Sequence, residues 1–254
     1  MSENNQLAGL SLIKCEMVGN SIMLLRVEDR QNKNTFSQAL TNEIDICLQI
    51  INRSENLKAV VITGYDSYFL SGGSKQELFE LHKGAMQFTD INTYRFGIDC
   101  NVPVIAAMQG HAIGGGFVMG LFCDLAVISR ESIYTFNFMK YGFTPGMGAT
   151  YIASEKLGAA LSCEMLLTAR RYRGEMLKTK GVAFDVLPRA EVLGASLDIA
   201  EALAEMPRKS LVHLKKHMNI RLNRELGECI ERELALHELT IHEPEVRSRI
   251  TKLF

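Results

Sequence analysis

Two glycine-rich segments have residue types and spacing suited to chemistry at a carbonyl group. The first reads SGGS at residues 71–74, and the second reads GGG at residues 114–116. Each follows an apolar segment typical of a buried strand and precedes a predicted helix, whose first N–H groups lack intrahelical acceptors. Two such N–H groups that converge on one oxygen form an oxyanion hole, which stabilises negative charge on a carbonyl oxygen. Either segment alone is also typical of a tight turn, so the prediction rests on the pair.

The elements that position these two segments are predicted to include parallel strands. Residues 21–27, 58–63, 102–108 and 124–129 are short apolar runs rich in branched side chains, which predicts buried strands. Residues 37–52 separate the first two runs and carry apolar side chains at helical spacing, so strand and helix alternate. The carboxyl ends of neighbouring parallel strands meet at one edge of a sheet, which would bring both glycine segments into one crevice.

The remainder of the chain is predicted to be mostly helical. Short strands are expected at 134–137 and 182–186, with a Gly- and Pro-rich loop at 141–150 between them. Further helices are predicted at 151–167, 173–180, 191–206, 210–219 and 226–237, and a last one from Glu243-Pro244 onward. The chain is therefore interpreted as an α/β domain at residues 1–190, followed by a helical C-terminal region at residues 191–254.

Composition argues against several classes of protein. The 254 residues carry a net charge of -1, which gives no reason to expect nucleic-acid binding. No apolar run approaches the roughly 18 residues of a membrane span, and the N-terminus lacks the pattern of a signal peptide. The six cysteines form no CxxC pair and no metal-ligand pattern is evident, so a cytoplasmic protein without a metal is expected.

Four segments resemble, in order and spacing, the crotonase (enoyl-CoA hydratase/isomerase) superfamily: FLSGGSKQE, VPVIAAMQGHAIGGGF, CDLAV and GFTPGMGAT. The resemblance implies a ββα spiral core, a helical C-terminal region that forms a homotrimer, and an acyl thioester substrate on a phosphopantetheine arm. It carries the family's oxyanion hole onto the backbone N–H groups of Gly73 and Gly115, which Gly72 and Gly114 precede. It implies no additional cofactor.

Two positions depart from the hydratases of this family. Hydratases use two glutamates to add water, and by alignment these positions hold Val118 and Phe138 here. Neither side chain can act as a general acid or base. With Asn137 beside them, they predict an uncharged wall of the substrate-binding pocket and an enzyme that does not add water.

A closer resemblance is to the decarboxylating crotonase homologues of polyketide β-branching, through KNTFSQALT, TGYDSYFLSGG, FMKYGFTPGMGAT and ELALHELTIHEPEVRSRI. It implies loss of CO2 from a 3-methylglutaconyl group on an acyl carrier protein, through a dienolate held in the oxyanion hole. Within it, His237 corresponds to the proton donor, and His242 is the next candidate. Gln87 stands where a lysine usually holds the substrate carboxylate; Lys83, which lies four residues earlier on the same helical face, is the alternative.

Other functions stay open. An enoyl-thioester isomerase would use His237 as a shuttle base, and a non-catalytic subunit would only bind the carrier protein. A serine hydrolase would use Ser71 or Ser74, but no matching His and Asp set is evident. Arg30 and Lys33 are either contacts to an acidic carrier helix or residues of a solvated turn. The same contact could be made by a second basic group: Lys209, Lys215 and Lys216.

Overall fold

The computed structural model describes residue 7 and residues 9–253, and its largest element is a six-stranded sheet. The strands lie in the order β1 (Ile13–Val18), β2 (Ile22–Val27), β3 (Ala59–Thr63), β5 (Val104–Met108), β7 (Leu125–Ser129) and β10 (Asp185–Leu187). β1 and β2 pair antiparallel, and every later pair is parallel. The predicted parallel strands are therefore confirmed.

A second sheet of four short strands accompanies the first. It has the order β4 (Tyr68–Leu70), β6 (His111–Ile113), β8 (Ile133–Thr135) and β9 (Tyr172–Arg173). Each of β3, β5 and β7 continues into a short strand of this sheet and then into a helix. This repeated strand–strand–helix unit is the expected ββα spiral. Of its short strands, only the one near residue 134 was predicted.

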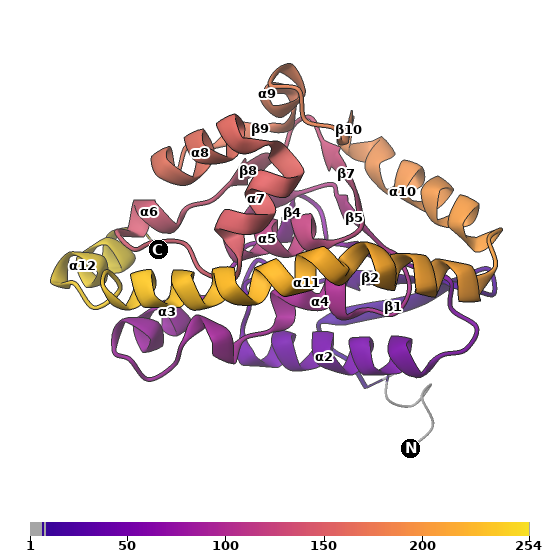
Figure 1. The fold of residues 1–254 in the computed structure, drawn as a ribbon, viewed down its shortest axis with the longest axis horizontal. Coiled ribbons are helices and arrows are strands. Elements are labelled where there is room, and N and C mark those ends of the chain that lie inside the picture. Colours follow the sequence, from indigo (N-terminus) through magenta and orange to yellow (C-terminus); the bar gives the residue numbers. More distant parts are fainter. Residues whose placement is uncertain (1–6, 8, 254) are drawn as a thin grey trace.

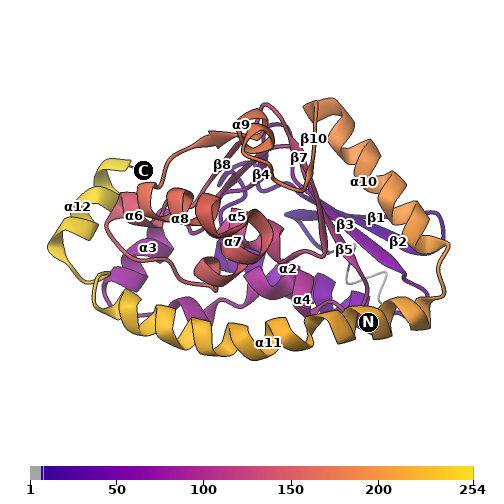
Figure 2. The same cartoon turned by 45° about the horizontal axis from the view of Figure 1, so that its top comes forward.

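Helices surround both sheets (Figure 1). They are α2 (Gln38–Arg53), α3 (Lys75–His82), α4 (Phe96–Asp99), α5 (Gly115–Phe122), α6 (Phe138–Tyr141), α7 (Ala149–Leu157), α8 (Ala159–Thr168), α9 (Gly174–Thr179), α10 (Arg189–Ala204), α11 (Arg208–Glu238) and α12 (Pro244–Leu253), with short 3-10 helices η1 (Phe88–Asp90) and η2 (Thr93–Arg95). Figures 1 and 2 both show α11 running along the length of the molecule, with α12 folding back beside α3 and α6. Within the described residues, no helix combines the length and apolar character needed to cross a membrane.

The six-stranded sheet is buried on both faces, which explains its apolar strands. Alternate side chains of a strand point to opposite faces, so β3 sends Val60 to the main core and Val61 to a second core. The second core lies under α10, which contributes Val192 and Ala200. This arrangement fixes the strands, and with them the glycine segments that follow their carboxyl ends.

Two helix predictions were wrong. The helix expected over residues 151–167 is split into α7 and α8 at Gly158, whose φ of 80° lies outside the helical region. The two helices expected over residues 210–219 and 226–237 are one continuous helix, α11, because residues 220–225 between them contain neither glycine nor proline. The expected absence of a signal peptide concerns a stretch whose residues 1–6 and 8 lie outside the described part of the chain.

Candidate active site

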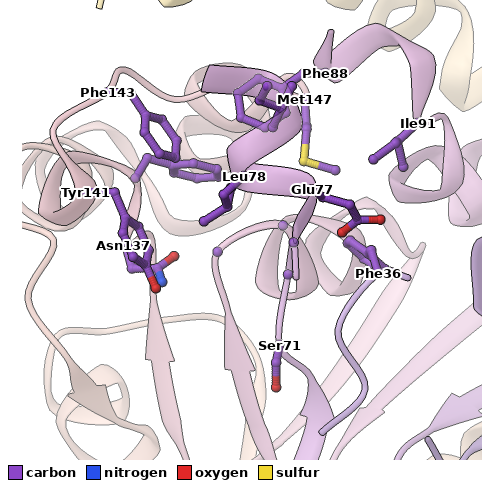
Figure 3. Close-up of a pocket in the computed structure, with 16 residues that line it drawn as sticks. Phe36, Ser71, Glu77, Leu78, Phe88, Ile91, Asn137, Tyr141, Phe143 and Met147 are labelled. Carbon is purple, nitrogen blue, oxygen red and sulfur yellow. The ribbon is translucent and has the colours of Figure 1, made fainter. Parts of the chain in front are cut away.

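A narrow cavity of about 50 Å³, partly open to solvent, lies where the two glycine segments meet (Figure 3). Figure 3 shows Tyr141 and Asn137 on one side of it and Phe36 and Ile91 on the other. Its lining comes from both glycine segments, α3, α6 and the loops that follow them: Phe36, Ser71, Gly72, Gly73, Glu77, Leu78, Leu81, Phe88, Ile91, Gly114, Gly115, Asn137, Phe138, Tyr141, Phe143 and Met147. The wall is mostly apolar. The predicted uncharged wall is found at Asn137 and Phe138, but one lining side chain, Glu77, carries a carboxyl group.

The two glycine segments approach so closely that side chains are excluded there. At Gly72, where φ is 74°, an added Cβ would lie 2.9 Å from the carbonyl oxygen of Ile113 and 3.1 Å from the nitrogen of Gly115. At Gly114, where φ is 53°, an added Cβ would lie 2.5 Å from Oδ1 of Asn137. Both positions therefore require glycine, for backbone conformation and for space.

The backbone N–H groups of Gly73 and Gly115 have no protein acceptor among the described residues. Gly115 is the first residue of α5, where a helical N–H has no intrahelical partner. The first segment is held by neighbouring backbone, because Phe36 N–H donates to the Gly72 carbonyl oxygen at 2.7 Å. Both glycines line the cavity, so the arrangement can accommodate a carbonyl oxygen between two donors.

One acidic side chain in the cavity wall was not predicted. Glu77 lies in the first turn of α3, where its Oε2 accepts from Ser74 N–H at 2.8 Å and its own N–H donates to Ser74 Oγ at 3.2 Å. Burial raises the pKa of its carboxyl group, and the hydrogen bonds from Ser74 oppose this rise. The sequence signal was available, since Ser-x-x-Glu before an apolar residue indicates a capping box.

His237 lies behind the cavity wall and does not line it. Its side chain is buried, and its ring centroid is 4.1 Å from that of Phe88 and 5.3 Å from that of Phe143. Burial lowers the pKa of the imidazole to about 4, so the ring is neutral at pH 7. Two phenyl rings that do line the cavity therefore separate this imidazole from it.

Gln87 and Lys83 also lie outside the cavity lining. The backbone at Gln87 is extended, with φ at -116° and ψ at 160°, so its side chain and that of Phe88 point to opposite sides. Phe88 faces the cavity and Gln87 is exposed. The ammonium group of Lys83 lies 3.4 Å from a carboxylate oxygen of Glu80 on the outer side of α3. The structure does not bring either side chain to the site.

The two positions that hold glutamates in hydratases are occupied differently. Phe138 lines the cavity together with Asn137, as predicted, and packs against Phe143 at a centroid distance of 6.3 Å. Val118 is fully buried in α5 and does not reach the cavity wall. An uncharged side chain stands at both positions.

The loop that closes one side of the cavity is anchored by the end of α11. The Glu233 carboxylate accepts from Gly148 N–H and Thr150 N–H, each at 2.7 Å, and from the Thr150 hydroxyl. Seven residues further on, just after α11 ends, Thr240 Oγ1 accepts from Thr144 N–H at 3.1 Å. Glu233 thereby caps the N-terminus of α7 across a long sequence separation, which no local pattern could reveal.

Two other candidates from the sequence have structural roles. The Ser71 hydroxyl donates to the carbonyl oxygen of Lys33 at 2.6 Å, and Ser74 caps α3, so neither has a histidine partner among the described residues. Lys215 cannot contact a carrier protein, because it is buried and donates to Asp124 at 2.7 Å and to two backbone carbonyls.

Comparison with known proteins gives a consistent result. The family model for enoyl-CoA hydratase/isomerase matches residues 17–253. The bacillaene synthase decarboxylase PksI of Bacillus subtilis is 51% identical over 244 residues, which cover 96% of this chain and 98% of that protein. A mitochondrial enoyl-CoA hydratase of Pongo abelii is 25% identical over 82% of this chain and 72% of that protein.

Comparison with solved structures gives the same result as comparison with sequences. A structure from a dehydratase/decarboxylase enzyme couple involved in polyketide β-branching has a TM-score of 0.95 at 51% identity, covering 96% of this chain and 99% of that one. The ECH2 decarboxylase domain of CurF from Lyngbya majuscula has a TM-score of 0.92 at 37% identity, with the same coverage of both chains.

Proposed function

Because this chain belongs to the enoyl-CoA hydratase/isomerase family, and its similarity is greatest to decarboxylases, we propose that it is a decarboxylase of polyketide β-branching. The observation that carries this proposal is a pair of unoccupied backbone donors, Gly73 and Gly115, in a cavity that lacks both hydratase glutamates. Such a site stabilises an enolate but has no pair of carboxylates to add water.

The substrate is a 3-methylglutaconyl thioester, and the product is a 3-methylcrotonyl-type thioester. The thioester oxygen accepts hydrogen bonds from the two glycine N–H groups. When the bond to the departing carboxyl group breaks, its electron pair moves into the thioester and forms a dienolate. Removing one donor from such a hole costs about 3 kcal/mol of transition-state stabilisation. The reaction uses no metal or organic cofactor, because the thioester itself accepts the electrons.

An acyl carrier protein presents this thioester on its phosphopantetheine arm. A groove between α3 and α12 is a suitable docking surface, because its lining has three cations, Lys75, Lys83 and Arg247, against one carboxylate, Glu80, around the half-buried ring of Phe79. Its cations complement the acidic surface of a carrier helix. Lys83 thus acts in docking on the outer side of α3, whose inner side contributes Glu77 to the cavity.

The chain is further proposed to form a homotrimer through its helical C-terminal region and to act in the cytoplasm. In support of the trimer, α11 exposes Leu214 and Met218, four residues apart on one face of the helix. Apolar side chains of this size on a helix surface favour a contact with another protein surface.

Intact-protein mass spectrometry of a carrier protein loaded with 3-methylglutaconate tests the reaction. The enzyme should remove the mass of one CO2 from the carrier. Formation of a double-bond isomer at unchanged mass would instead support an isomerase. No change in the acyl group would contradict both and leave a carrier-binding subunit.

Charge reversal tests the docking surface. The double variant Lys83→Glu/Arg247→Glu should raise KM for the carrier-bound substrate and leave KM for the short pantetheine thioester unchanged. Lys178→Glu on α9 is the matched control, because Lys178 is also exposed but lies away from the groove. Equal effects on both substrates would contradict docking there.

A further inference from the structure

Phe88 separates His237 from the cavity in this structure. The Phe88 ring lines the cavity on one side, and its centroid lies 4.1 Å from that of the imidazole on the other. Phe143 completes the barrier at 5.3 Å. A histidine in this position cannot touch a substrate unless a ring moves.

The imidazole itself indicates that a partner is missing. Nε2 of His237 is buried and has no hydrogen-bond partner in the described part of the chain. Leaving a buried polar atom unpaired costs about 1–3 kcal/mol. The groups that act electrostatically on this ring are Glu238 and His242, whereas the rings packed against it, Phe88 and Phe143, carry no charge.

The surroundings of Phe88 allow its ring to move. Phe88 begins the short 3-10 helix η1, and Gly84 before it has a φ of 71°. The ring lies over Gly146, where an added Cβ would be 2.4 Å from it. A small void beyond the ring is lined by Phe88 itself and by Thr89, Tyr94, Gly146, Met147, Ile230, Glu233 and Leu234. On that side the ring therefore borders the bare backbone of Gly146 and a small space, which the side chains of Tyr94, Met147 and Glu233 also line.

We infer that Phe88 is a positioning residue that acts as a gate: the substrate carboxylate displaces its ring, and Nε2 of His237 then faces the cavity. This inference rests on the proposed decarboxylation. The carboxylate stabilises the imidazolium form, which takes its proton from solvent. Loss of CO2 breaks the carbon–carbon bond, and the electron pair of that bond carries the negative charge from the carboxylate into the dienolate. The imidazolium then gives its proton to carbon, so charge and atoms balance.

A pair of inert ligands tests the inference in the wild-type protein. The saturated 3-methylglutaryl pantetheine thioester keeps the carboxylate but cannot form a dienolate, and 3-methylbutanoyl pantetheine lacks the carboxylate. The imidazole of His237 is titrated by NMR with each ligand bound. We expect the first ligand to move its pKa upward from about 4 toward about 6.5, the ordinary value, and the second to leave it unchanged. The same titration with both ligands would overturn the gate.

Substitution of Phe88 gives an independent readout. Phe88→Ala should raise the pKa of His237 without any ligand, because water reaches Nε2. Phe88→Leu is the milder variant if Phe88→Ala does not fold. Phe36→Leu is the control, since Phe36 lines the cavity near Gly115 and should leave the pKa of His237 unaltered. CO2 release by the wild-type enzyme is measured in parallel. If CO2 is released while the pKa of His237 does not change with either ligand or variant, the gate is contradicted and the decarboxylase proposal stands.

Discussion

Gly72 lies where the two glycine segments come closest, so one methyl group there should separate the two N–H donors. Gly72→Ala places a Cβ 2.9 Å from the Ile113 carbonyl oxygen and requires a positive φ. We expect the rate of decarboxylation to fall about 100-fold, as when one oxyanion donor is lost. Mass spectrometry of the loaded carrier measures this rate. Gly227→Ala, where an added Cβ meets no atom within 4 Å, should keep the wild-type rate.

The buried imidazole of His237 makes stability depend on pH. Its pKa is about 4 in the folded protein and about 6.5 in the unfolded chain, so between these values the unfolded chain binds more protons. The stabilising contribution is thus complete above pH 6.5 and is lost as pH falls toward 4, by about 3 kcal/mol.

Urea denaturation of wild type and His237→Phe at a series of pH values measures this contribution. The difference between the two free energies of unfolding should change by that amount over this pH range, in favour of the variant at low pH. His111, whose pKa burial also lowers, is common to both proteins and cancels in the difference. A difference that does not vary with pH would show that His237 is protonated equally in both states.

At the scale of elements, the break between α7 and α8 depends on one residue. Gly158 has φ of 80° and ψ of 156°, a region open to glycine alone, and an added Cβ would meet no atom there. Gly158→Ala should therefore lower the free energy of unfolding by about 1–3 kcal/mol through the backbone only. Thermal denaturation measures this, with Gly194→Ala in the interior of α10 expected to be neutral or stabilising. A stable Gly158→Ala protein would mean that α7 and α8 can join.

Sequence patterns predicted most elements that local residues determine. The apolar runs of β2, β3, β5 and β7 and the cavity position of Gly73, Gly115 and Phe138 were predicted correctly. The second sheet was largely missed because its strands have only two or three residues, too few for a period to be recognised.

Contacts between distant segments could not be predicted. The Glu233 carboxylate is 83 residues from the Thr150 amide that it binds. The aromatic layer over His237 depends on how η1 packs against α11, and the resemblance to a family gives the residue but not its surroundings. Gln87 was expected at the substrate carboxylate, and this position could not be checked from sequence for a related reason. Only the extended backbone at Gln87 shows that its side chain faces away from that of Phe88.

For the whole molecule, the proposed trimer can be tested on its exposed apolar face. Met218 is 67% exposed on α11, so a charge there should leave the folded protomer intact and weaken an interface. We expect Met218→Glu to shift the mass measured by light scattering from trimer to monomer. A monomeric wild-type protein, or a variant that stays trimeric, would show that this face lies outside any interface.

Helix α11 is anchored to the rest of the protein at two distant points, so the regions around these points are mechanically coupled. Lys215 fastens it beside Asp124, while Glu233, about 27 Å further along, fastens it to the loop at Gly148 and Thr150. That loop cannot open alone, because both amides would first have to leave a buried carboxylate. In native-state hydrogen exchange, the Gly148 and Thr150 amides should consequently exchange together, at the rate of global unfolding. Faster exchange at these two amides would mean that the wall of the cavity fluctuates independently of the helix.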